Sequence, residues 1–207
     1  MTEVKNYALP KLKYGLDELS PWLSTDQLAI HYQKHHQAYV NGANAILEKL
    51  EAARSEPSDL DIKGVIKEFS FQIGGHILHS LFWENLAPTG KGGGGEPNGN
   101  LKILITEQFK GLDRFKKEFT QGAMGVEGSG WMAFVYSQET NRLILGQIEK
   151  HNVNIFPNQE IIMVLDMFEH AYYLDYKNEK AKYIEGFWNI INWDEVAARL
   201  DKILRVN

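Results

Sequence analysis

The segment Leu165–Tyr176, LDMFEHAYYLDY, places a carboxylate, Asp166, four residues before an imidazole, His170. Residues four apart lie on one face of a helix, and the short apolar run at Ile161–Leu165 also allows a strand-to-helix junction here. In either geometry both side chains can reach one ion. A carboxylate with a nearby imidazole suits iron or manganese better than a soft metal. The segment therefore predicts part of a metal site.

Further candidate ligands come from histidines earlier in the chain. The sequence has seven histidines and no cysteine, so a metal must be held by imidazole and carboxylate rather than by thiolate. His31 and His35 lie four residues apart on one predicted helix, and His76 and His79 lie three apart on another. These four cannot all bind one ion, and a single histidine is more often a surface or hydrogen-bonded core residue. Spacing leaves the choice among them open.

The first half of the chain predicts an antiparallel helical hairpin. Ser-Thr-Asp at 24–26 is a helix start signal before a long helical pattern. A second helix is predicted from residue 61 to about residue 86. The turn-rich sequence RSEPSDLD at 54–61 is short enough to bring the two helices side by side.

The second half predicts a mixed domain. Helical patterns occupy 101–109 and 112–124, and two apolar runs then flank a polar turn at about 138–141, which is a hairpin signal. The run at 161–165 supplies a third strand. The expected class is α+β, with a small three-stranded antiparallel sheet and surrounding helices in the second domain. The expected bounds are an α-hairpin domain at 1–89, the linker GKGGGGEPNG at 90–99 and the mixed domain at 100–207.

Composition excludes several classes of protein. The 207 residues are 43% hydrophobic, which is enough for a packed core, and the net charge of -5 has no basic block, so nucleic-acid binding is not expected. The longest uninterrupted apolar run, Trp131–Tyr136, is far shorter than the roughly 20 residues of a membrane span. The start of the sequence lacks the pattern of a signal peptide. We therefore expect a cytoplasmic protein that binds no membrane.

Five separate blocks resemble the signature blocks of the iron/manganese superoxide dismutases. They follow the family order over nearly the whole chain, and the pattern is similar to that of archaeal members. The blocks are IHYQKHHQAYVNGAN from Ile30, GGHILHSLFWENLAP from Gly74, GSGW from Gly128, LDMFEHAYYLDYKN from Leu165 and FWNIINWDEV from Phe187.

The resemblance implies which residues hold the metal. The matched ligands are His31, His79, Asp166 and His170, with a water or hydroxide as fifth ligand. It implies one iron or manganese ion per chain, and we favour iron. Helical spacing alone pairs His31 with His35, whereas the resemblance places His35 beside the site and His76 outside the ligand set.

The resemblance also implies an activity, the dismutation of superoxide. One superoxide would reduce the metal from +3 to +2 and leave as dioxygen, and a second would reoxidise it and leave with two protons as hydrogen peroxide. Tyr39 and His35 would flank the substrate channel and pass protons inward. Many iron enzymes of the family carry a glutamine at the position of Gly75. Because glycine stands there, we expect His151, at the alternative position, to hydrogen-bond the bound solvent.

Several other positions follow from the resemblance. Trp83 and Trp131 would wall the site, while Phe168 and Ala133 stand where tryptophans are common in the family. Glu169 would bond His170 of the partner subunit, and Tyr173 would reach the partner's His35. The resemblance thus implies a homodimer and, in some relatives, a homotetramer of paired dimers.

Two other functions are weighed against this one. A non-haem iron oxygenase also uses two histidines and a carboxylate, but the third histidine and the lack of a recognisable cosubstrate pocket disfavour it. A structural relative could bind metal without turnover. The presence of all four expected ligands and of Tyr39 disfavours that alternative as well.

Overall fold

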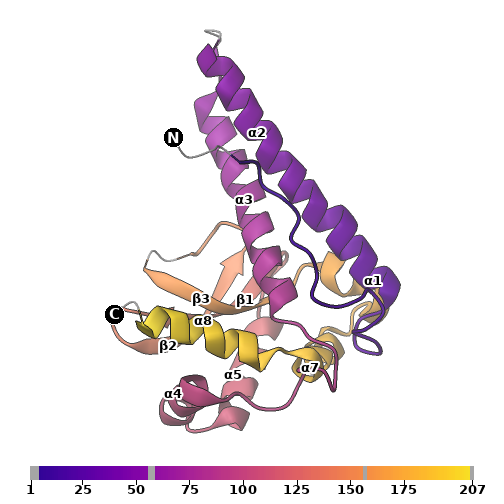
Figure 1. Cartoon of the computed structure of the whole chain (residues 1–207), viewed down its shortest axis with the longest axis vertical. Helices are drawn as coiled ribbons and strands as arrows, with labels where there is room; N and C mark the ends of the chain where they lie inside the picture. Colours follow the sequence, from indigo (N-terminus) through magenta and orange to yellow (C-terminus); the bar gives the residue numbers. More distant parts are fainter. Residues whose placement is uncertain (1–4, 56–58, 156–157, 206–207) are drawn as a thin grey trace.

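Two long helices and a three-stranded sheet form the two parts of the fold (Figure 1). The computed structural model describes residues 5–55, 59–155 and 158–205. The hairpin of α2 (Gln37–Ser55) and α3 (Ile62–Glu84) extends away from the part that holds the sheet. This arrangement confirms the expected α+β class. The domain bounds 1–89, 90–99 and 100–207 remain a prediction.

The first arm of the hairpin starts where the sequence indicates. The side chain of Ser24 caps α1 (Thr25–Ile30) by accepting a hydrogen bond from the backbone of Gln27. The expectation of one continuous helix is wrong, because a π-helical turn, η1 (His31–His36), separates α1 from α2. In such a turn the backbone bonds run from residue i to i+5. Residues five apart therefore come onto the same side, and both His31 and His36 are buried.

The second arm, α3, begins at a cap and packs closely on the first. Asp61 caps it by accepting from the backbone of Gly64 at 3.0 Å. Gly75 lets α3 approach α2, since a Cβ atom there would lie 2.7 Å from the ring of Tyr39. The predicted connection at 54–61 falls partly outside the described residues, because 56–58 are not described.

The glycine-rich segment 90–99 is bonded along the start of α8 (Trp193–Arg205). The backbone N–H of Gly94 donates to the carbonyl of Ile191 at 2.9 Å, and the indole of Trp193 donates to the carbonyl of Gly95 at 3.2 Å. A Cβ atom at Gly93 would lie 2.1 Å from a backbone oxygen, so only glycine fits there. The segment is therefore held in place by backbone contacts. Helix α4 (Gly99–Phe109) begins two residues earlier than expected.

The sheet has strand order β2-β1-β3 and is antiparallel throughout. Its strands are β1 (Gly130–Ser137), β2 (Arg142–Glu149) and β3 (Gln159–Asp166). The predicted turn at 138–141 joins β1 to β2. Every residue of the central strand β1 is buried, and its register places Trp131 opposite Asp166. Helix α5 (Leu112–Met124) packs on β1 and β2.

The C-terminal part consists of short elements rather than one long helix. They are η2 (Glu169–Ala171), α6 (Tyr173–Tyr176), α7 (Lys180–Ile190) and α8. Tyr172 and Tyr183 are buried in the core, whereas Tyr173 is 48% exposed. No described helix has the length and apolar character needed to cross a membrane.

Candidate metal centre

Four side chains from four different elements meet at the junction of the hairpin and the sheet. His31 begins η1, His79 lies on α3, Asp166 ends β3 and His170 lies in η2. One ligand atom from each lies within 4.8 Å of all the others. Asp166 and His170 therefore meet at a strand-to-helix junction, which was one of the two geometries allowed by their spacing.

Three imidazoles surround one carboxylate oxygen. The Nε2 atoms of His31 and His170 each lie 3.1 Å from Oδ2 of Asp166, and Nε2 of His79 lies 3.5 Å from it. His79 donates through Nδ1 to the carbonyl of Gly75 at 2.6 Å, so its Nε2 carries a lone pair. That Nε2 is buried with no hydrogen-bond partner among the described residues. A bound metal ion would satisfy it, and the donor set fits such an ion.

The protonation states also fit metal binding. Burial lowers the pKa of His31 to about 4 and lowers the pKa of His79 well below its usual value, so both rings are neutral near pH 7. Burial alone would raise the pKa of Asp166, but the neighbouring imidazoles of His170 and His31 lower it below its usual range. Neutral imidazoles and an ionised carboxylate suit a hard or borderline cation.

Hydrogen bonds fix the loop that carries the last two ligands. The backbone N–H of Phe168 donates to Oδ1 of Asp166 at 2.9 Å, which leaves Oδ2 toward the three rings. The buried side chain of Gln27 donates to the carbonyl of His170 at 2.6 Å and accepts from the backbone of Leu174 at 3.2 Å. Helix α1 therefore positions the loop after β3.

Aromatic rings enclose the centre as expected. Trp83 lies with its ring centroid 4.8 Å from that of His31, and Trp131 lies 4.9 Å from that of His79. Both indoles are buried. Phe168 stacks on His170 at 4.9 Å between centroids. These rings pack against three of the four candidate ligands, His31, His79 and His170.

His151 reaches the centre from the segment after β2. Its Nδ1 accepts a hydrogen bond from the indole of Trp131 at 3.0 Å, so the neutral ring carries its proton on Nε2. That Nε2 is buried and has no partner among the described residues. Burial lowers the pKa of His151 to about 4, which keeps the ring neutral. The ring stands 5.8 Å from that of His79 and offers a free donor beside the candidate ligands.

Comparisons with known proteins place this geometry in a family. The family model described as iron/manganese superoxide dismutases, alpha-hairpin domain, matches residues 6–87. The model described as iron/manganese superoxide dismutases, C-terminal domain, matches residues 97–199. The chain belongs to the iron/manganese superoxide dismutase family.

Relatives with assigned names are similar in sequence to this chain over nearly its whole length. A protein of Methanothermobacter thermautotrophicus named an iron superoxide dismutase is 52% identical, and the match covers 98% of each chain. One of Pyrobaculum aerophilum, also named an iron enzyme, is 48% identical over 99% of this chain and 96% of its own. One of Aeropyrum pernix, named a manganese/iron enzyme, is 44% identical over 99% and 95%.

The family assignment confirms the resemblance, the enzyme class and the iron-or-manganese cofactor expected from the sequence. It does not favour the oxygenase or the structural relative. Three imidazoles converge on the carboxylate here, whereas an oxygenase triad uses two.

Tyr39 and His35 lie against different rings of the candidate metal centre. The ring of Tyr39 lies 4.6 Å from that of His151 and 5.1 Å from that of His79, and burial raises the pKa of its hydroxyl. His35 is half-buried and stacks on His170 at 4.3 Å. It lines a surface depression of about 330 Å³ together with His170 and Glu169. His35 is thus outside the ligand group, as the resemblance implies.

His36 is a site residue that spacing and resemblance both missed. It is fully buried, and its Nδ1 accepts from the indole of Trp83 at 2.8 Å while its Nε2 pairs with Nδ1 of His76 at 2.9 Å. Its ring stacks on that of His79 at 5.3 Å. Burial lowers the pKa of His36 to about 3. The π-helical turn brings it inward, and α-helical spacing contains no signal for that turn.

Proposed function

We propose that this protein converts superoxide to dioxygen and hydrogen peroxide, with one iron or manganese ion held by His31, His79, Asp166 and His170. The observation that carries this proposal is the convergence of three imidazole Nε2 atoms on Oδ2 of Asp166. When bound, the ion supplies one-electron redox chemistry, taking an electron from one superoxide and giving it to the next. Two protons complete the hydrogen peroxide.

The four candidate ligand atoms already lie within 4.8 Å of one another, which suits a single bound ion. His31 and His79 are neutral, His79 is also oriented by its bond to Gly75, and the single carboxylate partly neutralises an added positive charge. Zinc would fit the same donors but has no second accessible oxidation state. We favour iron, since two of the relatives named above carry iron in their names, while the manganese/iron name of the third supports some tolerance of manganese.

The proton-handling groups in this proposal are Tyr39 and His35, which would flank the substrate channel, together with His151. His151 carries a hydrogen on its buried Nε2, which has no partner among the described residues, and would donate a hydrogen bond to a solvent molecule at the centre. Tyr39 is a neutral phenol at physiological pH even with an ordinary pKa, and burial raises that pKa further, so its hydroxyl keeps a proton that it can donate in a hydrogen bond. Gly75 leaves the space for the Tyr39 ring that a glutamine side chain would occupy.

The exposed rim of the centre supports a homodimer. Ile30, Tyr173 and Leu174 are 44%, 48% and 47% exposed and line the depression that contains His35 and His170. A second copy placed there would cover these apolar side chains. Glu169, exposed on the same rim, would then bond His170 of the partner subunit, and Tyr173 would bond the partner's His35.

The wider assembly and location follow from the same family pattern. We propose a homodimer that can pair into a homotetramer and that works in the cytoplasm, without nucleic-acid or membrane partners. The net charge of -5 and the absence of a basic block support the last point.

Metal-specific reconstitution tests the function. The apo protein would be loaded separately with iron, manganese and zinc, with metal per chain measured on each sample, and superoxide decay followed by stopped flow. We expect catalysis with iron, some catalysis with manganese and none with zinc. Full occupancy by iron and by manganese with no acceleration of decay would refute the proposal.

A further inference from the structure

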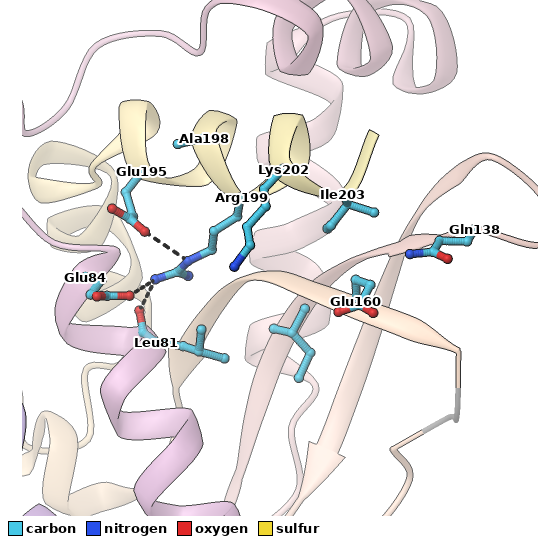
Figure 2. Close-up of a pocket in the computed structure, with 10 residues that line it drawn as sticks. Leu81, Glu84, Gln138, Glu160, Glu195, Ala198, Arg199, Lys202 and Ile203 are labelled. Atoms are coloured by element: carbon cyan, nitrogen blue, oxygen red, sulfur yellow. Dashed lines mark hydrogen bonds and ion pairs between the residues drawn. The ribbon is translucent and has the colours of Figure 1, made fainter. Parts of the chain in front are cut away.

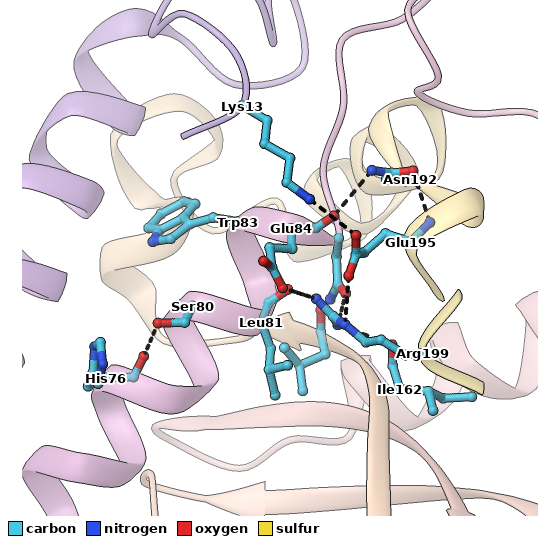
Figure 3. Close-up of polar contacts among 12 residues, drawn as sticks. Lys13, His76, Ser80, Leu81, Trp83, Glu84, Ile162, Asn192, Glu195 and Arg199 are labelled. Carbon is cyan, nitrogen blue, oxygen red and sulfur yellow. Dashed lines mark hydrogen bonds and ion pairs between the residues drawn. The ribbon is translucent and has the colours of Figure 1, made fainter. Parts of the chain in front are cut away.

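Arg199 is a nearly buried cation that lies away from the metal centre. Its guanidinium binds the last turn of α3. Its side chain is 12% exposed and enters from α8 (Figure 3). Nη1 donates to Oδ1 of Asn85 at 2.7 Å, and Nη2 donates to the carbonyl of Leu81 at 3.2 Å and to Glu84 at 2.9 Å. Of these acceptors only the Leu81 carbonyl is a backbone group, and it also accepts from the backbone N–H of Asn85 at 3.0 Å, so Arg199 adds a second bond at the carboxyl end of the helix.

The same guanidinium also binds the free edge of β3. Among the described strands, β3 pairs with β1 alone, so alternate carbonyls face away from the sheet along its other edge. Nη1 of Arg199 donates to one of these, that of Ile162, at 3.2 Å. Asn85, itself bound by Arg199, donates through Nδ2 to the next, that of Val164, at 2.7 Å. Arg199 and Asn85 therefore join α3 directly to β3.

Neighbouring charges hold the guanidinium in this position. Its Nε lies 3.3 Å from Oε1 of Glu195, whose Oε2 pairs with Lys13 at 3.2 Å. The group lines a groove of about 550 Å³ between α3, α8 and β3 (Figure 2). All three nitrogens of the guanidinium, Nε, Nη1 and Nη2, therefore contact acceptors. A lysine has one ammonium and cannot span these partners.

Both elements that Arg199 joins carry a proposed metal ligand. His79 lies six residues before Asn85 on α3, a rise of about 9 Å along the helix, and Val164 is two residues before Asp166 on β3. We propose that Arg199 is a positioning residue for the metal centre, which holds the helix of His79 at a fixed place against the strand of Asp166. The inference rests on the ligand set proposed above.

Metal retention and thermal unfolding test this role. Wild type, Arg199→Met and Arg199→Lys would be loaded with iron and, separately, with manganese, and metal release to a chelator measured below the unfolding transition. We expect release at least tenfold faster from Arg199→Met and an intermediate rate from Arg199→Lys. We also expect the difference in Tm between loaded and apo forms to shrink, because weaker binding gives less stabilisation.

A purely structural role gives a different result. It would lower the Tm of the loaded and apo forms equally and leave the release rate at the wild-type value, and that outcome overturns the inference. Arg114→Met, at an exposed arginine paired with Glu118, is the matched control and should leave both readouts unchanged. If Arg199→Met does not fold, Arg199→Lys decides on the same readouts. A wild-type chain that retains neither metal would instead refute the ligand set itself.

Discussion

At the scale of single residues, the hydrogen bond made by Nδ1 of a buried histidine determines whether its Nε2 carries a lone pair or a proton. His79 donates through Nδ1 to Gly75 and is left with a lone pair on Nε2, whereas His151 accepts through Nδ1 from Trp131 and carries its proton on Nε2. Two histidines with the same burial thus have opposite roles, one as candidate ligand and one as candidate donor.

The donor role of His151 predicts a specific loss. His151→Ala removes the Nε2–H group, and we expect turnover to fall about 10- to 100-fold while metal per chain stays at the wild-type level. His151→Gln replaces the ring with an amide donor and should keep a larger part of the activity. Stopped-flow superoxide decay with metal analysis measures both, and full activity in His151→Ala would exclude this role.

Residue types and spacing alone could not determine which histidines lie together at the candidate metal centre. The spacing of His31 and His35 suggests one shared face, and the five blocks that resemble the family correct this pairing. Neither helical spacing nor the resemblance predicted His36 as a residue of the site. Its burial depends on the π-helical turn and on bonds to Trp83 and His76 from the other arm of the hairpin. Such bonds between distant segments leave no local pattern.

At the scale of elements, the starts of α1 and α3 were predictable and the break within the first helix was not. The caps at Ser24 and Asp61 are encoded by the side chains that make them. The π-helical turn η1 has no comparable sequence signature, because the spacing of apolar residues that indicates a helix has the α-helical period of 3.6 residues. The hairpin turn at 138–141 was evident because two apolar runs flank polar residues.

Packing between α2 and α3 yields a prediction about Gly75. Gly75→Ala places a Cβ atom 2.7 Å from the Tyr39 ring, so α3 or the ring must move. We expect a loss of about 1–3 kcal/mol in the free energy of unfolding, together with reduced turnover. Gly146→Ala is the control, because a Cβ atom there meets nothing within 4 Å. Denaturant unfolding of both variants provides the measurement, and equal stability would contradict the packing argument.

At the scale of the whole molecule, the candidate ligands tie the hairpin to the sheet. His31 and His79 come from the hairpin, and Asp166 and His170 come from β3 and the loop after it. Metal removal should therefore lower stability as well as abolish activity. At a free metal concentration 100 times Kd, binding adds about 2.7 kcal/mol, which corresponds to a rise in Tm of roughly 5–10 °C for a chain of this size.

Calorimetry of the apo and loaded forms checks this expectation. Zinc should stabilise the fold much as iron does, since the donors fit it, even though it supports no turnover. Identical Tm values for the apo and iron-loaded forms would show that the ion does not join the two parts.

The proposed homodimer makes a prediction at the same scale. Ile30→Glu puts a charge on the apolar rim of the depression beside His170, where burial against a second copy would be costly. We expect sedimentation to shift from dimer toward monomer. Ile103→Glu, at an isoleucine of α4 that is 54% exposed, is the matched control and should leave the dimer intact. A dimer unaffected by Ile30→Glu would place the interface elsewhere.

The central claim is that one redox metal ion lies among His31, His79, Asp166 and His170. Crystallographic anomalous scattering measured on both sides of the iron and manganese absorption edges would locate and identify that ion directly. The account predicts one peak per chain, within bonding distance of the three Nε2 atoms and a carboxylate oxygen of Asp166. A fully active crystal with no peak there, or with its peak at other residues, would contradict it.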